Sequence, residues 1–144
     1  MLLNREDAKD AAQEVFTKLH RSLARFDDER DLGPWLYRVT VNVCRDVRRR
    51  SRGEVAFESG LDVASEATDP EQSAAAQRRR MVLDALGELS QREREVIVLR
   101  DLEGRSTEEV AEILGSSEGT VRSQLSTGRT KLKKHVMARL RRTK

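Results

Sequence analysis

A short helix bounded by clear start and stop signals most constrains what this chain can fold into. Ser106 and Glu109 form the capping-box pattern that opens a helix, and Gly115 ends that helix directly after Leu114. Ser117 can cap the longer helix that follows. The inward stripe of this longer helix, at helical spacing, is Val121, Leu125, Gly128, Leu132, Val136 and Leu140. A short helix, a glycine-containing turn and a longer helix together predict a helix-turn-helix.

The charge of the longer helix is one-sided. Residues 119–144 hold nine Lys or Arg and no Asp or Glu. The whole chain carries a formal net charge of +3, which divides into +2 over residues 1–50, −5 over 51–77 and +6 over 78–144. A plain helical hairpin does not need such an asymmetry, whereas binding to a polyanion does. Basic segments around an acidic one therefore indicate nucleic acid as the partner.

A further helix is expected directly before the helix-turn-helix. Ser90 and Glu93 repeat the capping-box pattern, and Gly104 is placed to end the segment. The apolar residues between these signals are Val96, Ile97, Leu99 and Leu102. Gly128, inside the basic helix, lowers helix stability by about 1 kcal/mol relative to Ala. Two interpretations of this glycine stay open, namely a close approach of another backbone and simple tolerance.

The N-terminal part of the chain begins with an amphipathic pattern. Asn4 or Asp7 can cap a first helix that runs to about Arg25. Its apolar stripe, at steps of three and four, is Ala8, Ala11, Ala12, Val15, Phe16, Leu19 and Leu23. The opposite side is polar and consists of Asp10, Gln13, Glu14, Lys18 and Arg21. We expect the Gln13–Glu14 pair to be exposed and to have no role in the fold.

A second helix is expected from about Pro34 to Arg50, because Pro is well tolerated in a first turn. Its apolar stripe is Leu36, Val39, Val43 and Val47. A polar set on a different face consists of Arg38, Asn42, Arg45 and Arg49. Such a face can follow a nucleic-acid strand, although a solvated face is the more common role of charged runs. Trp35 and Tyr37 are expected in the core, with an edge that can remain open for base stacking.

The periodicity lapses between the two halves. Residues 51–77 are dominated by Gly, Ser, Ala and acids, and they read as a linker. The predicted fold is therefore all-α, with two small helical domains joined by a flexible acidic linker. The expected domain boundaries are 1–52, 53–77 and 78–144.

Enzyme chemistry finds no support in the sequence. We find no nucleophile–base pair, metal-ligand set or phosphate-binding loop, so no catalytic residue, metal or cofactor is expected. Cys44 is expected to be a buried thiol, and His20 and His135 lie far apart in the sequence. No apolar run approaches membrane-spanning length, so no membrane contact is expected and the cytoplasm is the default compartment.

Three segments carry a resemblance to a known family. Asp7-Ala-Lys-Asp-Ala-Ala-Gln-Glu-Val-Phe16, Pro34-Trp-Leu-Tyr-Arg-Val-Thr-Val-Asn42 and Gly119-Thr-Val-Arg-Ser123 resemble bacterial sigma factors of the extracytoplasmic-function (ECF) group of the sigma-70 family. The resemblance covers nearly the whole chain except the linker, in the family's order. It implies a region 2-like domain that binds core RNA polymerase and the minus-10 element, and a region 4-like domain that reads the minus-35 element. It also implies that the first helix of region 2 would lie upstream of Met1, so that the chain is N-terminally short.

The resemblance assigns roles to particular residues. The residues that would contact core polymerase are Asp10, Gln13, Glu14 and Lys18. Those that would contact the minus-10 element are Phe26, Asp27, Arg30, Arg38, Asn42, Arg45 and Arg49. Those that would face the minus-35 groove are Arg122, Ser123, Ser126 and Thr127, with Thr120, Arg129 and Lys131 as phosphate contacts. Gln124 and Gly128 replace residues that are often Arg and Ala in the family, so no promoter preference is carried over.

The implied partners are therefore core RNA polymerase and promoter DNA, and the resemblance leaves an anti-sigma factor open as a third. An alternative is a helix-turn-helix regulator that never joins polymerase. It accounts for residues 90–144 equally well. It leaves the Gln13–Glu14 pair and the segment 34–42 without a role, so we prefer the sigma factor.

Overall fold

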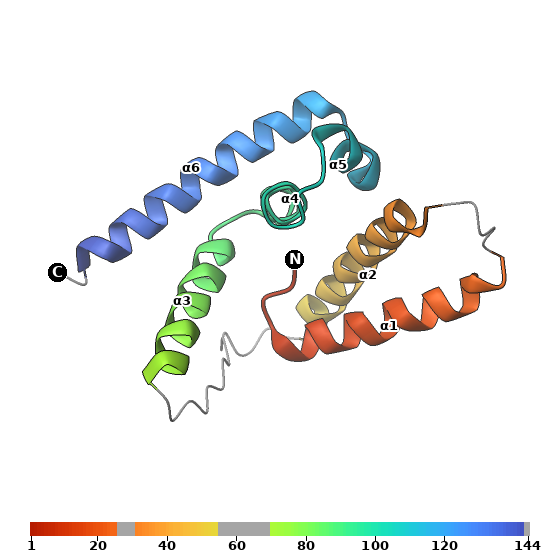
Figure 1. The fold of residues 1–144 in the computed structure, drawn as a ribbon, viewed down its shortest axis with the longest axis horizontal. Coiled ribbons are helices and arrows are strands. Elements are labelled where there is room, and N and C mark those ends of the chain that lie inside the picture. The colour runs from red at the N-terminus through yellow and green to blue at the C-terminus, as the bar shows by residue number, and fades with distance from the viewer. Residues whose placement is uncertain (26–30, 55–69, 143–144) are drawn as a thin grey trace.

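The computed structural model describes residues 1–25, 31–54 and 70–142 (Figure 1). The elements in chain order are α1 (Arg5–Leu23), α2 (Leu32–Glu54), α3 (Pro70–Gly87), α4 (Gln91–Ile97), a π-helical turn η1 (Val98–Leu102), α5 (Thr107–Leu114) and α6 (Glu118–Arg142). No strand occurs in these described ranges, so the all-α prediction is confirmed. None of the helices within them is long and apolar enough to span a bilayer.

The first two helices form an antiparallel hairpin (Figure 1). Asn4 caps α1, because its Oδ1 accepts hydrogen bonds from the Glu6 N–H at 2.8 Å and the Asp7 N–H at 3.3 Å. The buried side chains between the helices are Ala11, Val43 and Val47, with Leu2, Val15, Val39 and Cys44 packed around them. The expected inward position of Phe16 is wrong, since this residue is 69% exposed. α2 covers the side of α1 that holds Ala11, and Phe16 lies off that side.

Two helix boundaries differ from expectation. α2 begins at Leu32 rather than Pro34, where Asp31 Oδ1 accepts the Gly33 N–H at 2.9 Å. It also continues past Arg50 to Glu54.

Part of the segment expected to be a linker, 70–77, belongs to α3, while 55–69 lies outside the described residues. Pro at the first helical position and a following run of Ala, Gln and Arg favour a helix there, although the run lacks an apolar stripe.

The expected helix-turn-helix is present. Both capping boxes form: Ser90 with Glu93, and Ser106 with Glu109. Gly115 ends α5 with a φ of 62°, in the left-handed region that favours glycine. The expected cap Ser117 is also confirmed, since its Oγ accepts the N–H of Thr120 at 3.1 Å.

Gly128 marks a close approach of α6 to α4. A Cβ built at this position would lie 3.0 Å from Ile97 Cγ1 and 3.6 Å from Glu93 Cβ. Of the two interpretations left open by the sequence, the structure supports close approach. The glycine thus lets α6 lie directly on α4.

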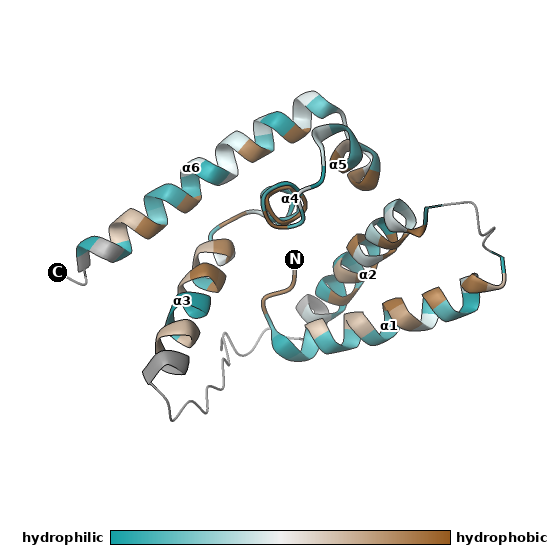
Figure 2. Cartoon of the chain, in the orientation of Figure 1, coloured by the Kyte–Doolittle hydropathy of each residue, from teal (hydrophilic) through white to brown (hydrophobic). Residues whose placement is uncertain are grey.

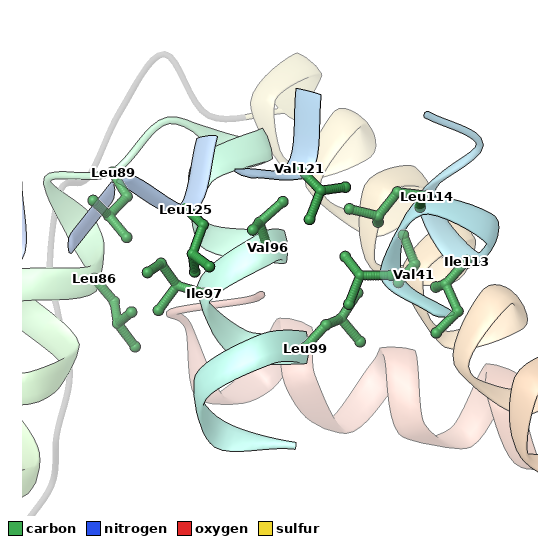
Figure 3. Close-up of a cluster of buried hydrophobic side chains, with 12 residues drawn as sticks. Val41, Leu86, Leu89, Val96, Ile97, Leu99, Ile113, Leu114, Val121 and Leu125 are labelled. Atoms are coloured by element: carbon green, nitrogen blue, oxygen red, sulfur yellow. The ribbon is translucent and has the colours of Figure 1, made fainter. Parts of the chain in front are cut away.

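One large apolar cluster joins the two halves of the chain (Figure 3). Its buried members are Val41, Leu86, Leu89, Val96, Ile97, Leu99, Val110, Ala111, Ile113, Leu114, Val121 and Leu125. All but one come from α3 to α6. The exception is Val41 of α2, which is 0% exposed and lies among these side chains in Figure 3. The expected apolar stripe of the second helix did not include this residue.

A buried arginine closes the end of α3. Arg94 is 4% exposed and donates hydrogen bonds to the carbonyl oxygens of Leu86 at 2.8 Å and Leu89 at 3.0 Å. The free carbonyls at a helix C-terminus need donors, and a guanidinium supplies several in one plane. The same side chain reaches Met1 O at 3.4 Å, so the beginning of the chain also packs on the C-terminal half.

Candidate nucleic-acid interface

The outward face of α6 is polar and open. Val121, Leu125 and Gly128 are buried against the rest of the C-terminal half. The helical repeat therefore directs the predicted minus-35 residues away from the core. Arg122, Ser123, Ser126 and Thr127 are all exposed, and they occupy the first turns of the helix. Figure 2 shows the corresponding stretch of α6 as mostly hydrophilic. The structure thus places these four predicted residues on one accessible surface.

The cations that flank this face are held by acids of the same half. Arg129 makes a two-pronged ion pair with Asp101 of η1, in which its Nε lies 3.0 Å from Oδ2. Lys131 Nζ lies 2.8 and 2.9 Å from the two carboxylate oxygens of Glu93. The neighbouring cations lower the pKa of Asp101 and of Glu93. Both basic residues therefore fix α6 on η1 and α4 and also remain partly exposed.

Two further residues at the start of α6 are held locally. Thr120 Oγ1 lies 2.9 Å from Ser117 Oγ, within the N-terminal cap of the helix. Arg122 forms an ion pair with Glu118, one turn earlier. Its side chain is 66% exposed, so this pair is a surface contact that a stronger partner can replace.

The predicted minus-10 face of α2 is placed differently. Arg45 makes a bidentate ion pair with Glu95 of α4, with distances of 2.9 Å from Nε to Oε1 and 2.7 Å from Nη2 to Oε2. Arg38 donates from Nη2 to the carbonyl oxygen of Glu112 on α5 at 3.4 Å. Asn42 is exposed, and Arg49 pairs with Asp46 on the same helix at 2.7 Å. Two of the four residues on this face thus contact the C-terminal half.

The aromatic residue next to this face is also engaged. Tyr37 Oη donates to Glu103 Oε2 at 3.0 Å, and Arg105 lies over its ring at 5.0 Å from the centroid. Burial, and then the hydrogen bond to Glu103, raise the pKa of Tyr37. The face of the ring that lies under Arg105 is therefore not open to a base in this arrangement.

Sequence reasoning missed one contributor to this region. Arg92 of α4 joins Arg45, Arg48 and Arg49 of α2 around an open cleft, with Gln91 beside them. Because Arg92 is far from α2 in the chain, only tertiary structure brings it there. The other predicted minus-10 residues, Phe26, Asp27 and Arg30, lie outside the described residues.

The predicted polymerase-contacting side of α1 is partly exposed. Asp10, Gln13 and Lys18 are exposed, as expected. Glu14 is half-buried, since it pairs with Arg50 of α2 at 2.8 Å and with Lys18 at 3.2 Å. The expectation that Glu14 has no role in the fold is therefore wrong. Hydrogen bonds from these cations lower its pKa.

An open surface cleft adjoins this side of α1. It is lined by Gln13, Phe16, Thr17, His20 and Arg21. The exposed Phe16 adds apolar surface to this cleft, next to the predicted polymerase contacts. Among the described residues, no group of His, Cys, Asp and Glu is arranged to hold a metal ion.

Two family models match this chain. The model described as Sigma-70 region 2 matches residues 1–54, and the model described as Sigma-70, region 4 matches residues 79–132. Among curated proteins, the RNA polymerase sigma factor CarQ of Myxococcus xanthus is 34% identical over 92% of this chain and 76% of its own length. The ECF RNA polymerase sigma-E factor of Haemophilus influenzae is 32% identical over 93% and 77%. For the ECF sigma factor SigM of Mycobacterium tuberculosis, at 33% identity, this chain spans 63% of the relative's length.

Two solved structures have the same fold. The sigma factor RpoE of Bartonella quintana, in complex with the anti-sigma factor NepR, is similar with a TM-score of 0.70 and 26% identity, over 94% of this chain and 84% of that one. CnrH in complex with the cytosolic domain of CnrY is similar with a TM-score of 0.66 and 28% identity, over 94% and 75%.

Proposed function

Because this chain belongs to the ECF group of RNA polymerase sigma factors, we propose that it binds core RNA polymerase and directs it to promoters for transcription initiation. The observation that carries the proposal is the presence of both sigma regions in one chain, in order, with an open polar face on the region 4 helix. A regulator that never joins polymerase has no need of the region 2 match. The role is one of recognition rather than catalysis, and it places the chain with RNA polymerase in the cytoplasm.

The C-terminal domain, 78–144, is proposed to read the minus-35 element through α6. Major-groove reading needs exposed side chains in the first turns of a helix, with cations beside them for phosphate. Arg122, Ser123, Ser126 and Thr127 meet the first condition. Thr120, Arg129 and Lys131 are proposed as the phosphate contacts. The last two are already oriented by their acidic partners, which reduces the entropy that DNA binding has to remove.

The N-terminal domain, 1–52, is proposed to bind polymerase through α1 and the minus-10 element through α2 and residues 26–30. Asp10, Gln13 and Lys18 form an accessible polar surface. Glu14 supports it indirectly, because its pair with Arg50 fixes α1 on α2. An anti-sigma factor is a further proposed partner, because the similar structure of RpoE contains one.

Complex formation with core RNA polymerase tests the proposal. Purified chain and core enzyme should elute together from a size-exclusion column. The double variant Asp10→Ala, Gln13→Ala should lose this co-elution, since both side chains are exposed on the polar side of α1. Lys9→Ala is the matched control on the same helix, because Lys9 is exposed and its Nζ pairs with the neighbouring Glu6 at 2.8 Å. Failure of the wild-type chain to bind core enzyme would favour the simple DNA-binding regulator.

A further inference from the structure

The open cleft between α2 and α4 gathers four arginine side chains. Arg45, Arg48 and Arg49 come from α2, and Arg92 comes from α4, with Gln91 beside it. The cavity measures about 420 Å³, which lies within the range of about 300–1,000 Å³ that small-molecule sites occupy. No acidic residue is among the described residues that line it. The lining of the cleft therefore suits an anion.

A buried carboxylate next to the cleft holds two of these arginines in place. Glu95 is 3% exposed, and its oxygens accept hydrogen bonds from Arg45 Nε at 2.9 Å and Nη2 at 2.7 Å. Arg92 Nη1 lies 3.7 Å from Oε2 of the same carboxylate. Gln91 Nε2 donates to its Oε1 at 3.0 Å. Because this acid pairs with arginines of both helices, the guanidinium groups are oriented before a ligand arrives, which lowers the entropy lost on binding.

The cations of the cleft are only partly neutralised. Arg45 uses one edge of its guanidinium on Glu95, although the group carries five N–H donors in all. The side chain of Arg92 is 53% exposed, and that of Arg49, which pairs with Asp46 at 2.7 Å, is 81% exposed. Four guanidinium groups thus meet two carboxylates, which leaves a surplus of two positive charges among these described residues. An anion between them relieves the mutual repulsion of the cations.

The number of donors indicates a ligand with more than one phosphate. A guanidinium group binds two phosphate oxygens side by side, which makes arginine the side chain best matched to this group. A single phosphate has too few oxygens to occupy four guanidinium groups in this way. A chain of linked phosphates offers successive pairs of oxygens along its length.

Promoter DNA fits this cleft less well than a small ligand. In the proposed function, α2 contacts the minus-10 element and α6 reads the minus-35 element, and these elements lie about 25 base pairs, or about 85 Å, apart along a duplex. Helix α4, which lies between α2 and α6 in Figure 1, packs directly on α6 at Gly128. Arg92 therefore stays with the minus-35 end and cannot line a cleft with Arg48 at the minus-10 end. The cleft belongs to the chain away from the promoter.

We propose that this cleft binds a free compound that contains a chain of phosphates, with Arg48 and Arg92 among its binding residues. The source of the chain is either inorganic polyphosphate or a nucleotide. The inference goes beyond the proposed function and rests on it only for the exclusion of promoter DNA. Neither Arg48 nor Arg92 has an assigned role in promoter binding, so the site can be tested separately.

Calorimetric titration of the full chain with inorganic tripolyphosphate, in buffer without Mg²⁺, tests the site directly. Wild type should bind one tripolyphosphate, at least about tenfold more tightly than orthophosphate at the same ionic strength. Arg92→Gln and Arg48→Gln should each weaken binding by about tenfold or more, because each removes charge-assisted hydrogen bonds. Arg79→Gln on α3 and Lys134→Gln on α6 are the matched controls, since both residues are exposed and lose the same charge. Both controls should bind like wild type.

A conservative variant and thermal melts separate a lost ligand contact from a damaged fold. Arg92→Lys keeps the charge but loses the planar fork, so its affinity should lie between those of wild type and Arg92→Gln. Without ligand, wild type and Arg92→Gln should melt at similar temperatures, because the Arg92 side chain is largely exposed. Saturating tripolyphosphate should raise the melting temperature of wild type and leave that of Arg92→Gln nearly unchanged. A loss of affinity in Arg92→Gln no larger than in the two controls would show an adventitious ion only and would overturn the proposal.

Further ligands identify the source of the phosphates. Adenosine or guanosine triphosphate that binds more tightly than tripolyphosphate, with the same loss in Arg92→Gln, would assign the site to a nucleotide. Equal or weaker binding of both nucleotides would assign it to inorganic polyphosphate. A single-stranded oligonucleotide that displaces tripolyphosphate and depends on Arg92 to the same extent would assign the cleft to DNA and overturn the inference. The sigma assignment fails on a different result, the absence of a complex between wild-type chain and core polymerase, so the two failures are distinguishable.

Discussion

Helices α2 and α6 carry similar basic patterns, but the rest of the chain contacts the two basic faces differently. On α6 the predicted DNA-facing residues point away from the core, and Val121, Leu125 and Gly128 of the expected stripe are buried. On α2 the buried set includes Val41, which the expected stripe did not contain, and Arg45 on the polar face pairs with Glu95 of α4. A periodic pattern therefore tells which residues share a helix face. It does not tell whether another part of the chain covers that face.

The two halves also differ in how they are stabilised. The C-terminal half supplies every buried member of the larger cluster except Val41, and its helices α4 and α5 are capped. The N-terminal hairpin buries Ala11, Val43 and Val47 and inserts Val41 into the larger cluster. We therefore expect the hairpin to depend on the C-terminal half more than the reverse.

The largest expected effect is that of a cavity in the shared core. Leu99→Ala should lower the free energy of unfolding by about 2–5 kcal/mol, because this side chain is fully buried. Hydrogen exchange should increase in α2 as well as in α4 to α6, since Val41 packs in the same cluster. Val82→Ala on α3, where the side chain is 50% exposed, serves as the control with little effect. Unchanged protection of α2 would mean that the two cores are independent.

The open face of α6 is tested by DNA binding. Arg122→Ala should weaken binding to a minus-35 sequence by about 1–3 kcal/mol, as for an arginine that contacts a base, and leave binding to random DNA nearly unchanged. Lys131→Ala should lower affinity evenly for all sequences and reduce its dependence on salt. Competition titrations at several salt concentrations distinguish the two. Equal losses on specific and random DNA for both variants would remove the groove assignment.

The close approach of α6 to α4 is tested by two glycine substitutions. Gly119→Ala should stabilise the protein by up to about 1 kcal/mol, because a Cβ there meets only Ser117 Oγ at 3.9 Å. Gly128→Ala gains the same helix propensity but places its Cβ 3.0 Å from Ile97 Cγ1. It should therefore be less stable than Gly119→Ala in chemical denaturation. Equal stabilisation by both substitutions would argue against tight contact at Gly128.

The smallest expected effect is a dependence on pH. Arg129 lowers the pKa of Asp101 below its ordinary value of 3.8. An acid whose pKa is lower in the folded state stabilises the fold above its unfolded pKa and loses that contribution as the pH falls through the folded value. Wild type should therefore lose more stability than Asp101→Asn between about pH 4 and pH 2 in thermal melts. Parallel losses in the two proteins would show that this pair contributes nothing to the contact of α6 with η1.

Local signals predicted the C-terminal half well. Capping boxes and helix-ending glycines act over three or four residues, so Ser90, Ser106 and Gly115 could be assigned from the sequence alone. The α3 helix was missed because it carries helix-favouring residues without an apolar stripe, and periodicity was the signal sought. The group of four arginines at the cleft between α2 and α4 could not be predicted from the sequence either, because Arg92 joins the other three only through tertiary packing.

Two other predictions were wrong because they also depend on how the helices pack. Phe16 fits the apolar periodicity of α1, yet which part of that stripe is covered depends on how α2 crosses it. Glu14 fits a solvated polar face, yet its distance to Arg50 is set by the hairpin. Helix faces could be predicted from spacing, whereas the partner of each face could not.

Promoter-directed transcription tests the central claim most directly. Core RNA polymerase should be mixed with this chain and a pool of promoter fragments, and the 5′ ends of the transcripts should be mapped. We expect transcripts from defined start sites that are absent with core enzyme alone. These start sites should share sequences about ten and 35 base pairs upstream, as the region 2 and region 4 assignments require. Arg122→Ala should lower the amount of these transcripts. Transcripts with no common upstream sequence, or none beyond those of core enzyme alone, would contradict the central claim.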